Sequence, residues 1–341
     1  MALKSPYISV IIPVYNGGRF LEECLDAVFR SSFQSFEILV VDDASTDKSA
    51  EIARQKDVLV LSMPKQSGPA AARNLAAESA RGEILMFVDA DVVLNIDTLA
   101  RVAKRFETQP EISALFGSYD DAPAEPNFLS QYKNLQHHFV HQTSNSAAST
   151  FWSGLGAIRK DVFLDFGGFD QNKFSIPSIE DIDLGFRLKR DGLNILLDRE
   201  IQAKHLKRWD LGSHLRTEIF ARALPWSKLI IAEKGMINDM NLKSTDRLSA
   251  VLTGLSLIML PLVLWKPIAL LVPFGLLGFV VFLNRRIFRF FIAKRGIFFA
   301  IAAIPFQFLY FFYSGSVFVL CWLYYKLPLF HRSPSETDLG A

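Results

Sequence analysis

Residues 83–94 read EILMFVDADVVL, an apolar run that ends at once in two aspartates, Asp89 and Asp91. The run Ile84–Val88 predicts a buried strand, because a short apolar segment bounded by polar residues is typical of a sheet interior. Burying one unpaired carboxylate is costly, and burying two neighbouring ones is costlier. The chain must therefore reach the surface after Val88, or a cation must lie between the two carboxylates.

Short apolar runs also occur three times before this strand. They are ISVII (8–12), FEILVVDD (36–43) and VLVLSM (58–63). Helical patterns separate them: RFLEECLDAVFRSS (19–32), STDKSAEIARQK (45–56), which Ser45 or Thr46 is expected to cap, and GPAAARNLAAESARG (68–82). Short strands alternating with helices predict right-handed crossovers and an α/β fold with a mostly parallel sheet.

Ligands of such sheets bind beyond the carboxyl ends of the strands. The residues expected there include an aromatic ring, an amide, four carboxylates and a Gly-containing loop: Tyr15, Asn16, Asp42, Asp43, 66–68, Asp89 and Asp91. A dinucleotide site would have G-x-G-x-x-G after the first strand, and YNGGRF (15–20) does not contain it. The net charge of +2 gives no general case for binding nucleic acid.

The last third of the chain is rich in apolar residues and predicts a membrane region. The runs 248–264 and 268–283 are near the lower limit of about 17–25 residues for a spanning helix and would form a tight hairpin, while 297–325 is longer. Between them, 284–296 interleaves five Lys or Arg residues with Ile and Phe, which is typical of an interfacial amphipathic helix on anionic lipid. The positive-inside rule places this segment in the cytosol.

We therefore expect a cytosolic domain over 1–240 and a multi-pass membrane region over 241–341. The N-terminal apolar run is short and ends at Pro13, so it does not have the pattern of a signal peptide. Cys24 and Cys321 lie far apart in apolar surroundings and are expected to be packing residues rather than a disulfide or a metal pair.

Asp89 and Asp91 together supply oxygen ligands of the kind that Mg²⁺ and Mn²⁺ prefer. A cation there would offset the repulsion between the carboxylates, and substrate phosphates would complete its coordination. The alternative is a solvated turn that caps the next helix, because D-x-D alone is a short motif.

Five motifs occur in one order along the chain: ISVIIPVYN (8–16), VVDDASTD (40–47), GPAAARN (68–74), MFVDAD (86–91) and GGFD with EDIDLGFRL (167–170 and 180–188). In this combination the chain closely resembles the family 2 glycosyltransferases, which have the Rossmann-like GT-A fold, invert the sugar's configuration and depend on a metal. The resemblance covers about residues 7–210.

The resemblance implies roles at the donor side. Tyr15 and Asp43 would meet the nucleotide base with Asp42 beside them, and helix capping is the alternative for either aspartate. Arg73 would lie near the diphosphate, which suits a guanidinium. Asp89 and Asp91 would bind the metal, with Asp91 the more direct ligand. The other residues assigned to the nucleotide-sugar site are Pro13, Asn16, Gly68 and Ala90.

Inverting transfer needs a base that takes the proton of the acceptor hydroxyl. The resemblance implies that Asp181 is this base and that Glu180 orients the acceptor or supports the base. Asp183 is expected to be structural. An acidic helix N-terminus without a catalytic role is the alternative for Glu180 and Asp181.

Further residues are assigned to the acceptor and diphosphate region: Trp152, Gly154, Arg208 and Trp209. The last two are similar to the end of the Q-x-x-R-W motif of processive members, but His205 stands where the Gln should be. That departure argues against a processive polymerase. His205 is either a third metal ligand or a packed side chain.

The sequence thus predicts an inverting, metal-dependent glycosyltransferase that moves a sugar from a nucleotide-diphosphate donor to a lipid or lipid-linked acceptor at the cytosolic membrane face. A soluble or polysaccharide acceptor is the nearest alternative. A sugar nucleotidyltransferase and a non-catalytic membrane scaffold are the alternatives from other classes.

Overall fold

The computed structural model describes residues 5–233, 239–240, 242–261 and 266–326. The chain divides into two compact units, Met1–Arg208 and Trp209–Leu339. This division lies earlier in the chain than the boundary at residue 240 that was expected between the cytosolic and membrane parts.

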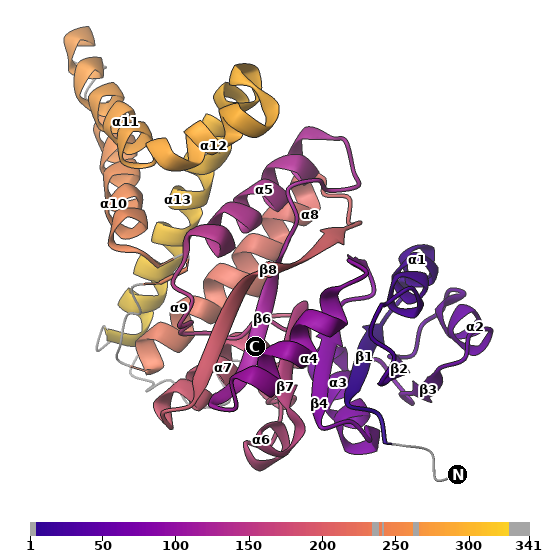
Figure 1. Cartoon of the computed structure of the whole chain (residues 1–341). Helices are drawn as coiled ribbons and strands as arrows, with labels where there is room; N and C mark the ends of the chain where they lie inside the picture. The colour runs from indigo at the N-terminus through magenta and orange to yellow at the C-terminus, as the bar shows by residue number, and fades with distance from the viewer. Residues whose placement is uncertain (1–4, 234–238, 241, 262–265, 327–341) are drawn as a thin grey trace. The chain divides into compact units, whose positions relative to one another are not determined.

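An eight-stranded sheet forms the centre of the first unit (Figure 1), in the order β3-β2-β1-β4-β7-β6-β8-β5. The strands are β1 Ile8–Val14, β2 Phe36–Asp42, β3 Leu59–Ser62, β4 Ile84–Val88, β5 Val92–Leu94, β6 Ile112–Tyr119, β7 Leu155–Arg159 and β8 Asn194–His205. The four strands β3, β2, β1 and β4 are parallel, whereas β7 is antiparallel to both β4 and β6. The predicted α/β class is confirmed, and the sheet is mixed, with four parallel and three antiparallel strand pairs.

Seven helices belong to this unit in the described part of the chain: α1 Gly18–Phe29, α2 Ser49–Arg54, α3 Gly68–Ser79, α4 Thr98–Thr108, α5 Phe128–Thr143, α6 Lys160–Asp165 and α7 Glu180–Arg190. The predicted capping of α2 by Ser45 or Thr46 is wrong. The helix begins later, and an Asp47 oxygen 2.9 Å from the Ser49 N–H shapes the turn before it. In a D-K-S turn the carboxylate competes well for the first free amide, because it is the stronger acceptor.

The register of the sheet positions the candidate site. Apolar residues of β1, β2 and β4 are almost fully buried and form the core with the inner faces of α1 and α4. Since these strands are parallel, Val14, Asp42 and Val88 bring their following residues to one edge. The antiparallel strand β7 starts at this edge, where Val88 pairs with Leu155 and the Asp89 N–H donates to the Gly154 carbonyl at 3.2 Å.

The second unit is helical in its described residues. Its elements are α8 Leu211–Arg216, the π-helical segment η1 Thr217–Ala223, α9 Leu224–Ala232, α10 Ser244–Met259, the 3₁₀ segment η3 Pro267–Leu270, α11 Leu271–Leu283, α12 Arg285–Arg295 and α13 Ile297–Lys326.

Among the described residues, α13 is the one helix that by itself has the length and composition of a membrane span. The segments 268–283 and 285–295 pass the same test only as a pair, and they are bent by 68°. Of the three predicted spans, only α13 is supported among the described residues, so the prediction of a multi-pass membrane region is not supported. Residues 262–264 of the first expected span lie outside the described residues.

Candidate active site

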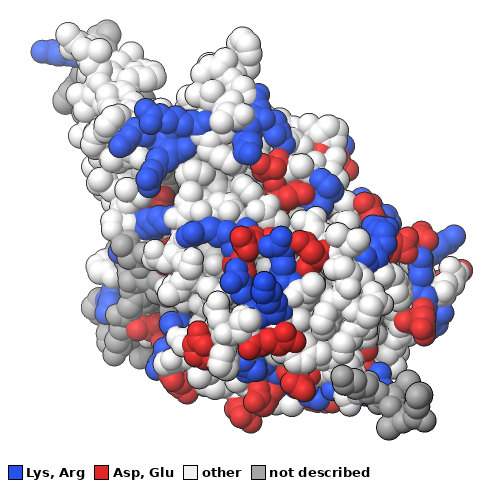
Figure 2. All heavy atoms as spheres, viewed as in Figure 1, with Lys and Arg blue, Asp and Glu red and all other residues white. Residues whose placement is uncertain are grey.

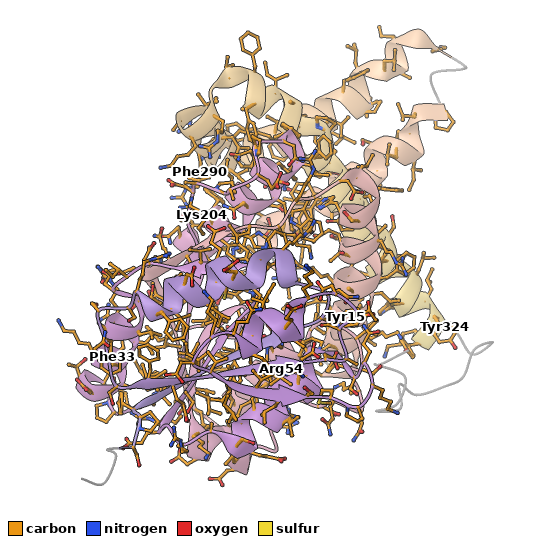
Figure 3. All side chains as sticks on the ribbon, turned by 90° about the vertical axis from the view of Figure 1, so that its right-hand side faces the viewer. Tyr15, Phe33, Arg54, Lys204, Phe290 and Tyr324 are labelled. Carbon is orange, nitrogen blue, oxygen red and sulfur yellow. The ribbon has the colours of Figure 1, made fainter. Side chains whose placement is uncertain are left out.

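The residues after β1 and β2 shape the loops at the sheet edge. The Asn16 side chain accepts from the Thr46 N–H at 2.8 Å, and Asp42 accepts from the Ser45 N–H at 3.1 Å. The ring of Tyr15, labelled in Figure 3, is 45% exposed and is available for stacking. Pro13 lies within β1 opposite Val41, so it supports this edge through the backbone.

Asp43 holds the N-terminus of α3. Its two carboxylate oxygens accept from the Ser67 N–H at 2.7 Å and the Gly68 N–H at 2.8 Å. Gly68 has φ +87°, and a Cβ there would lie 2.4 Å from the Ser175 carbonyl oxygen. A residue with a side chain could not adopt this conformation without moving the 175 loop. The structure therefore places Asp43 in a capping arrangement and Gly68 at a close backbone approach.

Arg73 joins the two acidic motifs. Its Nη2 lies 2.7 Å from Asp89 Oδ1 and its Nη1 lies 2.9 Å from Glu180 Oε1, with only 4% of the side chain exposed. Its Nε is buried and has no hydrogen-bond partner among the described residues. One guanidinium therefore connects the end of β4 with the first residue of α7.

Replacing Arg73 with Gln should destabilise the full chain by ~3–5 kcal/mol, because it leaves the buried Glu180 carboxylate without its cation. Thermal and urea unfolding of the full-length protein in detergent would measure this loss. Arg81→Gln is the matched control, since Arg81 also pairs with a glutamate, Glu37, but is 67% exposed. Since Arg81 is exposed, and Glu37 keeps its hydrogen bonds from the Ser9 hydroxyl and the residue 81 N–H, losing this pair should cost only ~0–1 kcal/mol. Equal losses for the two variants would contradict the buried bridge.

Glu180 and Asp181 open α7 and are both buried. Asp181 Oδ2 accepts from the Ser153 N–H at 2.9 Å and from the Ser153 hydroxyl at 3.1 Å. Burial raises the pKa of Glu180 against the opposing charge of Arg73. Burial likewise raises the pKa of Asp181, although the Ser153 hydrogen bonds and Arg73 oppose the shift. A carboxylate with a raised pKa is a better proton acceptor than an exposed one.

Asp183 does not contact Arg73 and forms two ion pairs of its own, with Lys173 Nζ at 2.6 Å and Arg187 Nε at 3.0 Å. Those partners anchor the loop before α7 to the helix, because Arg187 also donates to the carbonyl of Phe166 at 2.7 Å. The third acid of the EDID motif therefore lies in a structural network.

Asp91 lies beside His205 rather than beside Arg73. Asp91 Oδ2 is 3.6 Å from His205 Nε2, and the imidazole stacks on Tyr119 with ring centroids 4.2 Å apart. Burial opposes ionisation of Asp91, but its contact with His205 holds the pKa of the carboxyl below its usual value. The described residues contain no cluster of three or more His, Cys, Asp or Glu close enough together to bind a metal.

The donor set nevertheless fits a divalent cation whose coordination a ligand completes. An ionised carboxylate and an imidazole face each other at Asp91 and His205, and Mn²⁺ accepts oxygen and nitrogen ligands. Arg73 holds one oxygen of Asp89, and 36% of the Asp89 side chain is exposed. Phosphate oxygens would have to supply the remaining ligands.

The remaining predicted site residues lie at varied places. Ala90 packs against the core between the two aspartates, and Trp152 stands edge-on to Tyr119 at 4.9 Å. A Cβ at Gly154 would lie 2.6 Å from the Trp152 ring. Arg208 pairs with Glu125 at 3.1 Å, and Trp209 is the first residue of the second unit.

Three residues that position this site were not among the site residues predicted from the sequence. Ser153 holds Asp181, and Asn74 clamps the Phe169 backbone through two hydrogen bonds at 2.8 and 3.0 Å. A Cβ at Gly185 would lie 2.3 Å from the Phe151 N, so this glycine allows α7 to lie directly on the segment that carries Ser153. Asn74 and Gly185 stood inside the quoted motifs, whereas a lone Ser beside Trp152 gave no signal.

The arrangement combines features of a group-transfer site. It has buried carboxylates at one helix start, a carboxylate–imidazole pair at the sheet edge, and a guanidinium between the two acidic motifs. An exposed aromatic ring follows the first strand of the same sheet. A phosphorylated donor with a planar base and a hydroxyl-bearing acceptor fit this set of groups.

Comparison with known proteins agrees with this chemistry. Residues 9–167 match the model of the family described as "Glycosyl transferase family 2". An uncharacterized glycosyltransferase of Haemophilus influenzae is 35% identical over 130 residues, which cover 37% of this chain and 52% of the relative. The match thus spans about half the length of that relative. The poly(ribitol-phosphate) beta-glucosyltransferase of Bacillus spizizenii is 39% identical over 102 residues, 28% of this chain and 16% of the relative.

A solved structure extends the likeness to most of the fold. The mannosyltransferase PcManGT of Pyrobaculum calidifontis, in complex with GDP-Man and Mn²⁺, superposes with a TM-score of 0.56 at 18% identity. The superposition covers 94% of this chain and 87% of that one. The GT-A type of fold expected from the motifs is thereby confirmed, and residues 9–167 are the part of the chain that resembles the glycosyl transferase family 2.

Proposed function

We propose that this protein transfers a sugar from a nucleotide-diphosphate donor to an acceptor hydroxyl with inversion of configuration, and that Asp181 is the base. The observation that carries the proposal is the Arg73 bridge between Asp89 and Glu180. It brings the motif expected to bind the donor and the motif expected to activate the acceptor to opposite ends of one guanidinium. A sugar held between those motifs would have its leaving group and its attacking hydroxyl on opposite sides.

Each residue then has a defined task. Tyr15 stacks on the base, and Asn16 and Asp42 hold the loops around it. Arg73 is assigned to the donor diphosphate, which it would meet from the side of Asp89, because Asp89 and Glu180 hold its two terminal nitrogens. Asp181 accepts the acceptor proton while Ser153 fixes its orientation. Glu180 holds Arg73 in place from the acceptor side.

Asp91 and His205 would hold a divalent cation, Mg²⁺ or Mn²⁺, with Asp89 nearby. When bound, such an ion stabilises negative charge on the departing diphosphate. The fit of an ionised carboxylate facing an imidazole supports this assignment. That a structurally similar mannosyltransferase was solved with Mn²⁺ also supports it.

We further propose that the acceptor is a lipid or a lipid-linked molecule presented at the cytosolic membrane face. The support is the second unit, whose α13 has the composition of a membrane helix and whose α12 carries five Lys or Arg residues. The activity for which the Bacillus spizizenii relative is named favours a polymer acceptor as the second candidate. Transfer to a detergent-solubilised polyprenyl phosphate or glycolipid, but not to a soluble polyol phosphate, would separate them.

A thermal-shift screen of nucleotide sugars tests the donor side, because a ligand that binds only the folded state raises stability. A nucleotide sugar at 100 times its dissociation constant should contribute about 2.7 kcal/mol, and only in the presence of Mg²⁺ or Mn²⁺. Tyr15→Ala should weaken the shift, while Phe29→Ala, a comparably exposed aromatic on α1, should leave it unchanged. If no nucleotide sugar raised the melting temperature with either metal, the proposed donor class would be wrong.

A further inference from the structure

Helix α13 exposes one apolar stripe along almost its whole length. Its 30 residues extend over ~45 Å. The exposed apolar side chains of this stripe are separated by three, eleven, seven and four residues: Phe298, Ile301, Phe312, Val319 and Leu323. Other positions of the helix are buried: Ala300, Ala303, Gln307 and Phe311. The stripe from Phe298 to Leu323 is ~38 Å long, which exceeds the ~30 Å hydrocarbon core of a bilayer.

A charged contact lies near the middle of this helix. The Tyr313 hydroxyl donates to Glu218 Oε2 at 3.0 Å, and Glu218 is only 4% exposed in η1. Arg222 Nη1 lies 3.3 Å from the other Glu218 oxygen, and its side chain is 48% exposed. Tyr313 follows Ile297 by sixteen residues, which is ~24 Å along the helix axis. The parts of α13 before and after Tyr313 are each shorter than the ~30 Å hydrocarbon core. If α13 crossed the bilayer, this contact would therefore lie inside the core.

If α13 crossed the bilayer perpendicular to the membrane plane, Glu218 and Arg222 of η1 would lie within the lipid. Arg222 would then expose half of its side chain at the depth of the acyl chains, where a cation costs at least ~2.5–3.5 kcal/mol. A helix lying along the membrane face avoids this cost. Its stripe can face the acyl boundary while η1 and α9 cover the opposite side, and the length of such a helix is not limited by bilayer thickness.

The charge of the segment fits an anionic surface. Between Arg247 and Lys326 the sequence has no Asp or Glu and eight Lys or Arg residues. In Figure 2, Lys and Arg side chains gather over α12. Anionic headgroups attract such a segment by about 1 kcal/mol for each basic residue near the surface.

We propose that α13 lies in the plane of one anionic lipid leaflet and does not cross the bilayer, although its length and composition would allow it to. Glu218, Tyr313 and Arg222 fix the rotation of the helix so that its apolar stripe faces the lipid. The proposal rests on the membrane attachment in the proposed function. With α13 lying in the leaflet, no single described helix long enough to span the bilayer crosses it, so the end of α13 lies on the same side of the membrane as the N-terminal unit.

Single cysteines in sealed inside-out membrane vesicles test the proposal. The full-length chain would carry Cys24→Ala and Cys321→Ala, and then Lys326→Cys at the end of α13. Arg54→Cys on the exposed face of α2 is the reference for the side of the N-terminal unit (Figure 3). We expect a membrane-impermeant maleimide to label Lys326→Cys and Arg54→Cys to the same extent. Labelling of Lys326→Cys only after detergent is added would overturn the proposal.

Tyr324→Cys serves as a second position if the first variant does not accumulate. Its ring is 45% exposed and projects outward from the last turns of α13 (Figure 3). A polarity-sensitive probe on Phe298→Cys should shift to the blue when phosphatidylglycerol vesicles are added. An unchanged spectrum, or cross-linking of Phe298→Cys between two copies without vesicles, would show that another protein surface covers the stripe and would overturn the lipid assignment.

Sugar transfer measured in the same vesicles separates this proposal from the proposed function. Equal labelling with no transfer to any acceptor would count against the glycosyltransferase assignment and leave the orientation of α13 standing. Labelling of Lys326→Cys from the opposite side with normal transfer would overturn only the orientation of α13.

Discussion

Asp181→Asn should reduce sugar transfer by roughly 10²–10⁴ while donor binding survives, since that is the usual contribution of a positioned base. Asparagine keeps the size of the side chain and can still accept from Ser153, but it cannot take a proton. Initial rates of transfer, together with the donor-induced thermal shift, would measure the two effects separately.

Asp183→Asn is the matched control on the same helix. Asp183 is also buried, but its partners are Lys173 and Arg187, so its loss should lower stability more than the rate constant of transfer. Near-normal transfer by Asp181→Asn, with Glu180→Gln inactive, would show that the base is Glu180 and not Asp181.

The pH dependence provides an independent readout. Because burial raises the pKa of Asp181, the acid limb of the pH–rate profile should lie above the ordinary aspartate value of about 3.9. The base is active only when ionised, so transfer should rise as the pH increases through this folded-state pKa. Asp181→Asn should remove the limb from the residual activity.

Asp91→Asn should reduce transfer at least a hundredfold and remove its dependence on added metal. Asparagine lacks the charge that attracts a divalent cation, and a loss of about 3 kcal/mol in charge stabilisation corresponds to this factor. The metal dependence of donor binding and of transfer would be measured with Mn²⁺ titrated into EDTA-treated protein.

Asp97→Asn is the control for this experiment, because Asp97 pairs with Arg101 on the surface and lies six residues further along the chain. It should retain the metal dependence of the unmodified protein. Undiminished transfer by the unmodified protein in excess EDTA would rule out the metal assignment.

Much of the sheet could be predicted from the sequence because its signals are local. The apolar runs that became β1, β2 and β4 are short and end in polar turns, so their period and boundaries were readable. The antiparallel placement of β7 was not, because residues 155–159 pair with a strand about seventy positions earlier. No local pattern reports such a pairing.

The candidate site divides in the same way. Asp89, Asp91, Glu180 and Asp181 could be found because they stand in recognisable motifs. The capping arrangement of Asp43 was one of two stated alternatives, and only the fold brings it to the Gly68 amide. Arg73 was expected beside the diphosphate, yet its bridge to Glu180 depends on contact between residues 107 positions apart. Ser153 became identifiable only once α7 was seen to lie on its backbone.

The Arg73 bridge also constrains how proteins with this site can diversify. The residues expected to recognise the nucleotide lie in the first 91 positions, and those expected to meet the acceptor lie from Trp152 onward. Recombination between two relatives in the intervening segment would pair one donor specificity with another acceptor specificity. Such a chimera keeps a compensated charge network only if the two parents supply a compatible Arg73 and Glu180. The bridge thus acts as a compatibility requirement between two otherwise separable halves.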